Sequence, residues 1–133
     1  LFVNGKGSNV ELRNIDFGAC VHEHIIVASG AFVRYQAAWT ISGSAPNHWT
    51  ITDGGTVIAS TLTCTITGTP AFSTFAVLDD LSLAVVQSIT FSGSATGARY
   101  SVTLNAVLNT FGAGATFLPG DSAGSTATGG QYA

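Results

Sequence analysis

Hydrophobic and polar residues alternate over short stretches of this chain, and glycine and serine fill the breaks between them. The clearest stretch is TLTCTITG at 61–68, in which threonine alternates with Leu62, Cys64 and Ile66. A period of two residues is typical of a β-strand that buries one face. No window shows the 3.6-residue period of an amphipathic helix, and β-branched and aromatic residues dominate the alternating stretches. The pattern therefore predicts an all-β chain of short strands.

The alternating stretches recur about every 25 residues. The residue that opens each turn is hydrophobic in every copy, at Phe17, Ile41, Ile66, Phe91 and Phe117. A glycine follows within three residues each time, at Gly18, Gly43, Gly68, Gly93 and Gly120. Two further columns keep nearly the same spacing, namely Ile15, Trp39, Cys64, Ile89 and Ala115, and Ile25, Trp49, Phe75 and Tyr100. Coincident columns of this kind indicate a repeat architecture in which each repeat is one structural unit.

A repeat of about 25 residues is too short for a propeller blade, which needs roughly 40. It fits one coil of a parallel β-helix, in which coils stack about 4.8 Å apart and each column becomes an internal ladder. The recurring glycines then mark corners that need a positive φ or leave no room for a Cβ atom. We expect about five coils of 24–26 residues over 1–120, followed by a Gly-rich C-terminal capping segment, 121–133, in which the period is lost. The end coils of such a rod expose unpaired strand edges, which we expect to be capped, continued by further chain or buried in an oligomer.

The composition predicts a surface with few charged residues. Only 8% of the residues are charged, against roughly 25% in ordinary soluble proteins, so serine and threonine must supply the polar surface. The four basic residues are scattered and the net charge is −3, which argues against nucleic acid as a partner. No apolar run is long enough to span a membrane. The chain begins at Leu1 and lacks methionine, and we expect it to be a piece of a longer or processed protein.

Three aspartates are candidate catalytic groups. Asp53 and Asp79 are 26 residues apart, which predicts nearly the same corner on adjacent coils, and Asp80 follows directly. Glycosidases use two carboxylates, about 5 Å apart in retaining enzymes and roughly 6.5–9.5 Å apart in inverting ones. Aspartate beside glycine or a second aspartate is also ordinary turn chemistry, and we favour that role.

Histidines form a second polar cluster. His22, Glu23 and His24 are consecutive, and His48 follows His24 at the coil spacing. A metal site needs three or four converging ligands. We therefore expect the two spaced histidines to stack at a surface corner, and we expect neither a metal nor a cofactor.

Membership of the repeat columns separates the remaining candidate residues into interior and surface ones. The aromatic residues in the columns are expected in the interior, because isoleucine and cysteine replace them in other coils: Trp39, Trp49, Phe75 and Tyr100. Arg34, Tyr35 and Arg99 fall outside the columns, and we expect them at the surface. Arg34 and Tyr35, with Asp79 and Asp80, are the candidate ligand-binding residues. Cys64 is expected to be a buried free thiol.

Two segments in the second half of the chain have distinctive sequences, FSGSATGARYSVTLNAVLNT at 91–110 and FLPGDSAGSTATGGQYA at 117–133. They resemble the C-terminal region of phage and prophage tail-fibre or tailspike-like proteins, in which TGTPAF, here at 67–72, also recurs. Such proteins commonly close on a Pro-Gly-Asn/Asp-x-Ala-Gly segment and a final Gly-Gly-Gln-Tyr. The matching residues are Leu118, Pro119, Gly120, Asp121, Ala123, Gly124, Gly129, Gly130, Gln131 and Tyr132. The resemblance implies a right-handed parallel β-helix, a homotrimer, and a virion-associated, extracellular location facing the host.

These expectations define three functional hypotheses. The first is a structural and host-recognition module that binds a cell-surface glycan or another virion protein. The second is a polysaccharide depolymerase that acts through Asp53, Asp79 or Asp80. The third is a purely architectural shaft. No catalytic motif accompanies the segments that carry the resemblance, so we favour a non-enzymatic module.

Overall fold

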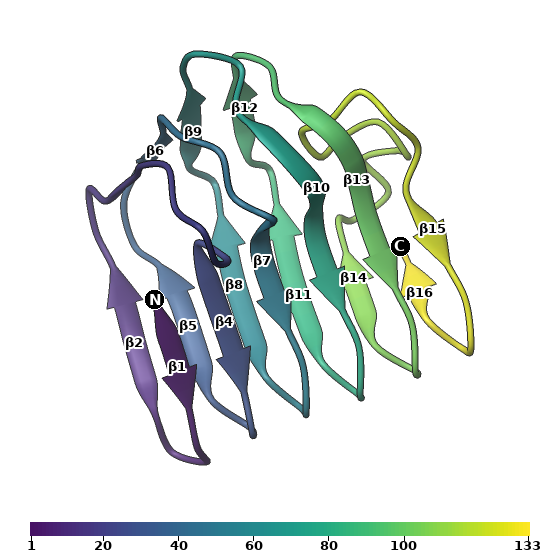
Figure 1. Cartoon of the computed structure of the whole chain (residues 1–133). Helices are drawn as coiled ribbons and strands as arrows, with labels where there is room; N and C mark the ends of the chain where they lie inside the picture. Colours follow the sequence, from purple (N-terminus) through teal and green to yellow (C-terminus); the bar gives the residue numbers. More distant parts are fainter.

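Sixteen short strands follow one another along the chain in the computed structural model, which describes all residues from 1 to 133. No residue is helical, and every strand pairing is parallel. The first four coils of the chain each contribute one strand to each of three sheets, and the later coils contribute strands to two of them. The two termini lie at opposite ends of the resulting rod (Figure 1). The predicted fold class, an all-β parallel β-helix of about five coils, is confirmed.

The three sheets run the length of the rod. Sheet A contains β1 (Phe2–Asn4), β4 (Ile25–Ala28), β7 (Asn47–Ile51), β10 (Ala71–Leu78), β13 (Thr96–Val102) and β15 (Ser125–Thr126). Sheet B contains β2 (Asn9–Leu12), β5 (Phe32–Tyr35), β8 (Thr56–Ser60), β11 (Leu83–Gln87), β14 (Val107–Asn109) and β16 (Gln131–Tyr132). Sheet C contains β3 (Asp16–Phe17), β6 (Trp39–Ile41), β9 (Thr63–Ile66) and β12 (Thr90–Ser92).

The first predicted ladder is correct over three coils and wrong at the fourth. Phe17 pairs with Ile41, and Ile41 pairs with Ile66, as the spacing predicted. Phe91, however, pairs with Cys64 and not with Ile66, because the register advances 27 residues between the third and fourth coils. The repeat is therefore less regular in space than its hydrophobic columns suggest.

The second predicted ladder, which places Phe75 beside Trp49, is wrong at the same 27-residue step between the third and fourth coils. Trp49 pairs with Ala76 and not with Phe75. The register of β10 against β13 also shifts between Ala71 and Thr74, which marks a β-bulge. Phe75 and Ala76 are consequently both buried. An inserted residue of this kind leaves the burial of the aromatic ring intact while it moves the backbone partner.

The interior of the rod is one continuous hydrophobic core, as expected from the columns. The predicted interior aromatics are all less than 9% exposed: Trp39, Trp49, Phe75 and Tyr100. Cys64 is buried and free, as predicted, and burial raises the pKa of its thiol to about 12. Most of the predicted ladder residues therefore face inward even where their exact coil partners differ.

With one exception, each corner glycine has at least one of the two predicted features, a positive φ or no room for a Cβ atom. Gly93 has a φ of +111°, and a Cβ atom there would collide with the carbonyl oxygen of Ile66. At Gly43 a Cβ atom would collide with the backbone of Ala19. Gly18 has an ordinary φ and open space around it, so the prediction is wrong at that corner.

The C-terminal segment 121–133 adds one strand to sheet A and one to sheet B, whereas sheet C ends at β12. The Asp121 carboxylate accepts a hydrogen bond of 2.8 Å from the Gly97 N–H, and the Tyr132 ring stacks on Tyr100 with 4.2 Å between centroids. These contacts hold the segment against the last full coil. No helix that could cross a membrane is present.

Candidate binding face on sheet C

The outward side of sheet C carries polar side chains at the same position in four successive coils. Alternation within each strand turns Phe17, Ile41 and Ile66 inward and their neighbours outward. Pairing then aligns the outward residues in one column, Asp16, Thr40, Thr65 and Ser92. A second outward pair, Thr63 and Thr90, lies beside this column. We call these six residues the sheet C face.

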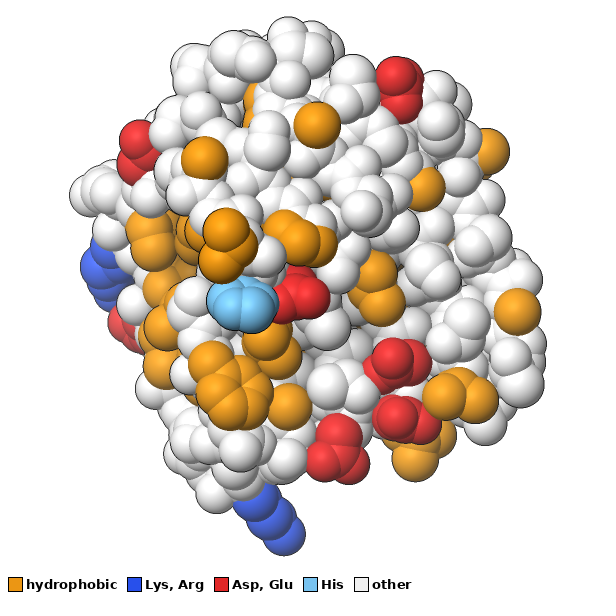
Figure 2. Space-filling view, viewed as in Figure 1, with side chains coloured by type: hydrophobic (Ala, Val, Ile, Leu, Met, Phe, Trp, Pro, Cys, Tyr) orange, Lys and Arg blue, Asp and Glu red, His pale blue; other side chains and the backbone are white.

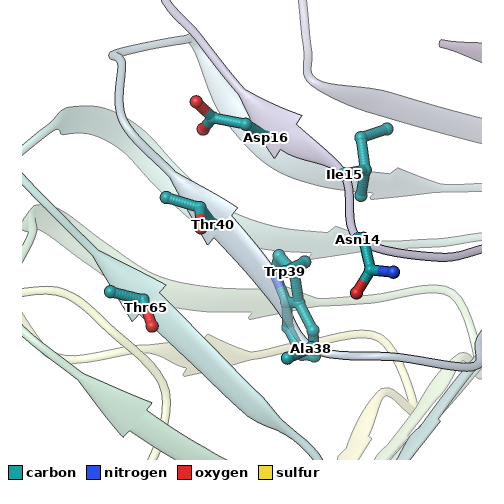
Figure 3. A pocket seen from close by; sticks show the side chains of 7 residues that line it. All are labelled: Asn14, Ile15, Asp16, Ala38, Trp39, Thr40 and Thr65. Atoms are coloured by element: carbon teal, nitrogen blue, oxygen red, sulfur yellow. The ribbon is translucent and has the colours of Figure 1, made fainter.

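A hollow of about 250 Å³ lies at the N-terminal end of the sheet C face. It is lined by Asn14, Ile15, Asp16, Ala38, Trp39, Thr40 and Thr65. Figure 3 shows Asp16, Thr40 and Thr65 in a row on three successive strands, with Asn14 toward one side. The hollow thus spans the first three coils and presents side chains from each of them.

Hydrogen bonding leaves much of this hollow free to bind a ligand. The Asp16 Oδ1 accepts a hydrogen bond of 2.8 Å from the Ser42 hydroxyl, which holds the carboxylate in place. The hydroxyls of Thr40 and Thr65 make no hydrogen bond within the chain, and no basic residue lines the hollow. Carboxylate, carboxamide and hydroxyl groups together offer both acceptors and donors. The arrangement suits a neutral, hydroxyl-rich ligand.

Two other hollows lie at the corners of the rod. One of about 340 Å³ surrounds the corner 18–24, and one of about 230 Å³ lies between 91–95 and 116–120. In the space-filling view, hydrophobic side chains gather around a histidine and an acidic side chain (Figure 2). Val21, in the first of these corners, is 85% exposed.

The candidate catalytic aspartates sit at the corner between sheets A and B, and their pairing differs from the prediction. Ile51 pairs with Leu78, so Asp53 lies opposite Asp80 on the next coil, and Asp79 lies one position earlier. Asp53 and Asp80 both have positive φ angles, of 51° and 46°, as turn residues do. None of the three aspartates lines a hollow.

Local contacts of these aspartates are those of a turn. The Asp53 carboxylate accepts a hydrogen bond of 3.0 Å from the Ser29 hydroxyl on the preceding coil. The Asp80 carbonyl oxygen accepts one of 2.8 Å from the Gly54 N–H. Asp79 keeps one buried carboxylate oxygen without a partner.

Tyr35 is buried and not at the surface, which corrects the prediction. It is 3% exposed, and its hydroxyl accepts a hydrogen bond of 2.9 Å from the Trp49 Nε1–H. The reason is the alternation within β5, which turns Arg34 outward and Tyr35 inward. Arg34 is exposed, and its guanidinium lies 5.4 Å from the centre of the Phe32 ring. No hollow is lined by Arg34, Tyr35, Asp79 or Asp80, so the structure does not bring these candidates into one site.

Arg99, also expected at the surface, is partly buried. Its Nη1 donates a hydrogen bond of 3.0 Å to the Ser122 carbonyl oxygen. Arg99 therefore helps to attach the C-terminal segment and is not free for a ligand.

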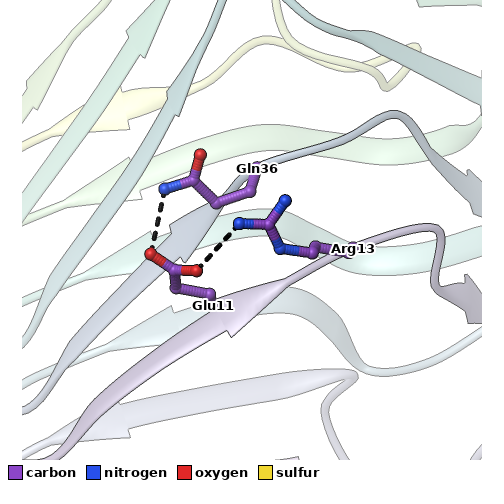
Figure 4. A network of polar contacts seen from close by, with 3 residues as sticks. All are labelled: Glu11, Arg13 and Gln36. Atoms are coloured by element: carbon purple, nitrogen blue, oxygen red, sulfur yellow. Dashed lines mark hydrogen bonds and ion pairs between the residues drawn. The ribbon is translucent and has the colours of Figure 1, made fainter.

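A polar network on sheet B was also missed from the sequence. Arg13 forms an ion pair of 3.1 Å with Glu11, and the Gln36 amide donates a hydrogen bond of 3.1 Å to the other Glu11 oxygen (Figure 4). The Arg13 and Glu11 side chains are 62% and 51% exposed, so the pair contributes at most about 1 kcal/mol. The network connects the first coil to the second.

The two spaced histidines are in the interior, which corrects the expectation of a surface stack. His24 is 4% exposed and His48 is fully buried, among the rings of Phe17, Phe72 and Phe75. Nowhere do three His, Cys, Asp or Glu side chains come together in a way that could hold a metal ion.

The polar residues of the sheet C hollow were not singled out from the sequence. A signal for them was present, because alternation in 61–68 places threonine on the outward side of β9. The pairing across coils was needed to show that Asp16, Thr40 and Thr65 form one row.

No protein-family model, curated protein or solved structure matches the chain. The fold and the site define an architectural class, a parallel β-helix with one polar, hydroxyl-rich outer face.

Proposed function

We propose that this chain is a structural and recognition module of the phage tail-fibre or tailspike kind, whose sheet C face contacts a saccharide on the host surface. The observation that carries the proposal is the hollow on the sheet C face, where Asp16, Thr40 and Thr65 line up across three coils. Saccharides bind through hydroxyl groups that both donate and accept hydrogen bonds, and these side chains match that requirement.

Two further properties support a saccharide over other ligand classes. The hollow lacks basic residues, which disfavours phosphorylated ligands. The polar residues also repeat at the coil spacing of about 4.8 Å, so the face can contact an extended chain along several coils. The resemblance of the segment 117–133 to tail-fibre proteins supports an extracellular, virion-associated setting. In that setting, another virion protein is the alternative partner.

The proposal includes assembly as a homotrimer. Support comes from the outward side of sheet B, where half-buried apolar side chains lie on adjacent strands: Phe32, Ile58, Leu83, Val85 and Val107. Apolar surface on an outer sheet face favours packing against another such face. Three rods packed side by side would cover this surface and leave sheet C open. Light scattering at micromolar concentration tests this arrangement, and a monomer would contradict it.

Binding to a panel of purified bacterial surface polysaccharides tests the recognition role. Thr65→Val and Asp16→Asn should each weaken binding of a positive polysaccharide by about tenfold, the effect of roughly 1.4 kcal/mol. Thr96→Val is the matched control, because Thr96 is a half-buried threonine at the start of β13 on sheet A, outside the hollow and away from the sheet B surface. Equal binding by all three variants would contradict the proposal.

The depolymerase alternative rests on one observation, the position of Asp53 opposite Asp80 on adjacent coils. New reducing ends released from a bound polysaccharide, and lost in Asp80→Asn, would favour it over simple recognition. A trimer that binds no polysaccharide would instead favour the purely architectural shaft.

A further inference from the structure

A pair of buried histidines connects the corner 18–24 to the third coil. His24 directly precedes β4 and His48 lies in β7, and their Nδ1 atoms are 2.9 Å apart. The Nε2 of His24 is 3.0 Å from the carbonyl oxygen of Gly18, which lies at the start of the corner. A chain of two hydrogen bonds therefore runs from Gly18 through His24 to His48.

The partners determine which nitrogen of each ring carries the proton. A carbonyl oxygen only accepts, so the Nε2 of His24 must carry a proton and donate it to Gly18. The Nδ1 of neutral His24 is then an acceptor, and the Nδ1–H of His48 donates to it. This leaves the Nε2 of His48 as a buried acceptor, and that atom has no partner. With both rings neutral, the hydrogen bonds from His48 to His24 and from His24 to Gly18 are both formed.

The surroundings offer little to stabilise an additional proton. His48 is packed against aromatic rings from β3, β7 and β10, namely Phe17, Trp49, Phe72 and Phe75, with no charged side chain among them. The charges that act on His24 are the Asp16 carboxylate, which favours its protonated form, and the N-terminal amine, which opposes it. Cys20, His22 and Glu23 share the hollow beside His24.

Both rings consequently bind protons more weakly in the folded chain than in the unfolded one. Burial is the main cause of the lowered pKa of His24 and of His48, and the neighbouring His24 lowers the pKa of His48 further. Since an unfolded histidine has a pKa of about 6.5, the unfolded chain takes up these protons first as the pH falls. Stability from the pair is thus fully present above about pH 6.5 and is lost below it.

An added proton is costly on either ring, because both rings are buried. Protonation of His24 at Nδ1 would place two N–H groups against each other, unless His48 moved its own proton to the unpartnered Nε2. Protonation of His48 at Nε2 would bury a charge within the aromatic cluster, which is costly. The less costly response is for His24 to leave, because it lies beside the hollow of about 340 Å³ and its corner is already exposed at Val21.

We propose that the His24–His48 pair is an acid-sensitive latch, which releases the corner 18–24 from the rod when the pair takes up a proton. Asp16 lines both the hollow beside the latch and the sheet C hollow, so release also disturbs the binding face. The latch itself does not depend on the proposed function, and it is tested without any ligand.

Hydrogen exchange and chemical denaturation between pH 7.5 and 5.5 test the latch. The corner 18–24 and β4 should exchange about tenfold faster at the lower pH, after correction for intrinsic rates, while β11 and β13 stay protected. The denaturation midpoint should fall over the same interval. His24→Gln should remove most of the pH dependence of exchange at the corner, because an amide does not titrate there, and only part of that of the midpoint, to which buried His48 still contributes. His22→Gln, at an exposed position of the same corner, should keep both.

NMR of the histidine side chains makes the test independent of how the variants fold. At pH 7.5 the wild-type chain should show His24 protonated at Nε2 and His48 at Nδ1. The opposite protonation pattern, or a corner that stays protected after the pair has titrated, would overturn the proposal. So would a pH dependence that is unchanged in a folded His24→Gln variant.

Discussion

Tyr35 shows how strongly a single buried polar contact constrains this rod. Its hydroxyl is the acceptor for the Trp49 Nε1–H, and both side chains are buried. Tyr35→Phe would leave that N–H without a partner, so we expect the free energy of unfolding to fall by about 1–3 kcal/mol. Urea denaturation measures this change. Tyr132→Phe is the control, because its hydroxyl donates to the exposed Gly114 carbonyl and its loss should cost less.

The two cysteines should differ completely in reactivity. Cys20 is exposed, whereas Cys64 is buried with its thiol pKa raised to about 12. A thiolate is the reactive form, so a thiol reagent at pH 8 should label one cysteine in the folded chain and two in denaturant. Peptide mapping should find the native label on Cys20. Native labelling of Cys64 would show that the third coil opens readily.

At the scale of an element, two corner glycines differ in why a larger residue would destabilise the rod. Gly68 has a φ of +71° with open space around it, whereas Gly93 combines a φ of +111° with a collision at the Ile66 carbonyl oxygen. We expect Gly68→Ala to cost about 1–2 kcal/mol, from the left-handed backbone alone. Gly93→Ala should cost clearly more, because the backbone of two coils must separate. Equal denaturation midpoints for the two variants would contradict this account.

The attachment of the C-terminal segment depends on the ionised Asp121 carboxylate. The hydrogen bond from the Gly97 N–H is the main cause of the lowered pKa of Asp121. A group with a lowered folded pKa contributes stability above its unfolded pKa of about 3.9 and loses it as the pH falls further. Asp121→Ala should therefore increase proteolysis within 121–133 at pH 7. The wild-type segment should show the same sensitivity only under acid conditions.

At the scale of the whole molecule, the stack of coils predicts a gradient of stability. Each coil pairs its strands only with those of neighbouring coils, so inner coils have two pairing partners and the end coils have one. Amide exchange should be slowest in β7, β8 and β10 and fastest in β1 and β15. Uniform protection along the chain would indicate that the rod unfolds as one unit.

Much of the architecture was predictable, and the polar row of the sheet C face was not. The 25-residue period and the inward aromatics, such as Trp39 and Trp49, follow from local patterns that any coil must satisfy. The hollow at Asp16 could not be predicted, because it depends on which residues of neighbouring coils stand side by side. Tyr35 and His48 were misplaced at the surface for a related reason, since a polar side chain is buried when a partner elsewhere in the chain satisfies it.

The sequence by itself determined the all-β class, the coil length and the inward side of the clearly alternating strands, because alternation and period are local properties. Only the tertiary structure decided the 27-residue step that pairs Phe91 with Cys64, the burial of the His24–His48 pair and the row of polar groups on sheet C. These features arise between coils, where turn lengths and one bulge set the register. The proposed recognition and the acid-sensitive latch both depend on that register.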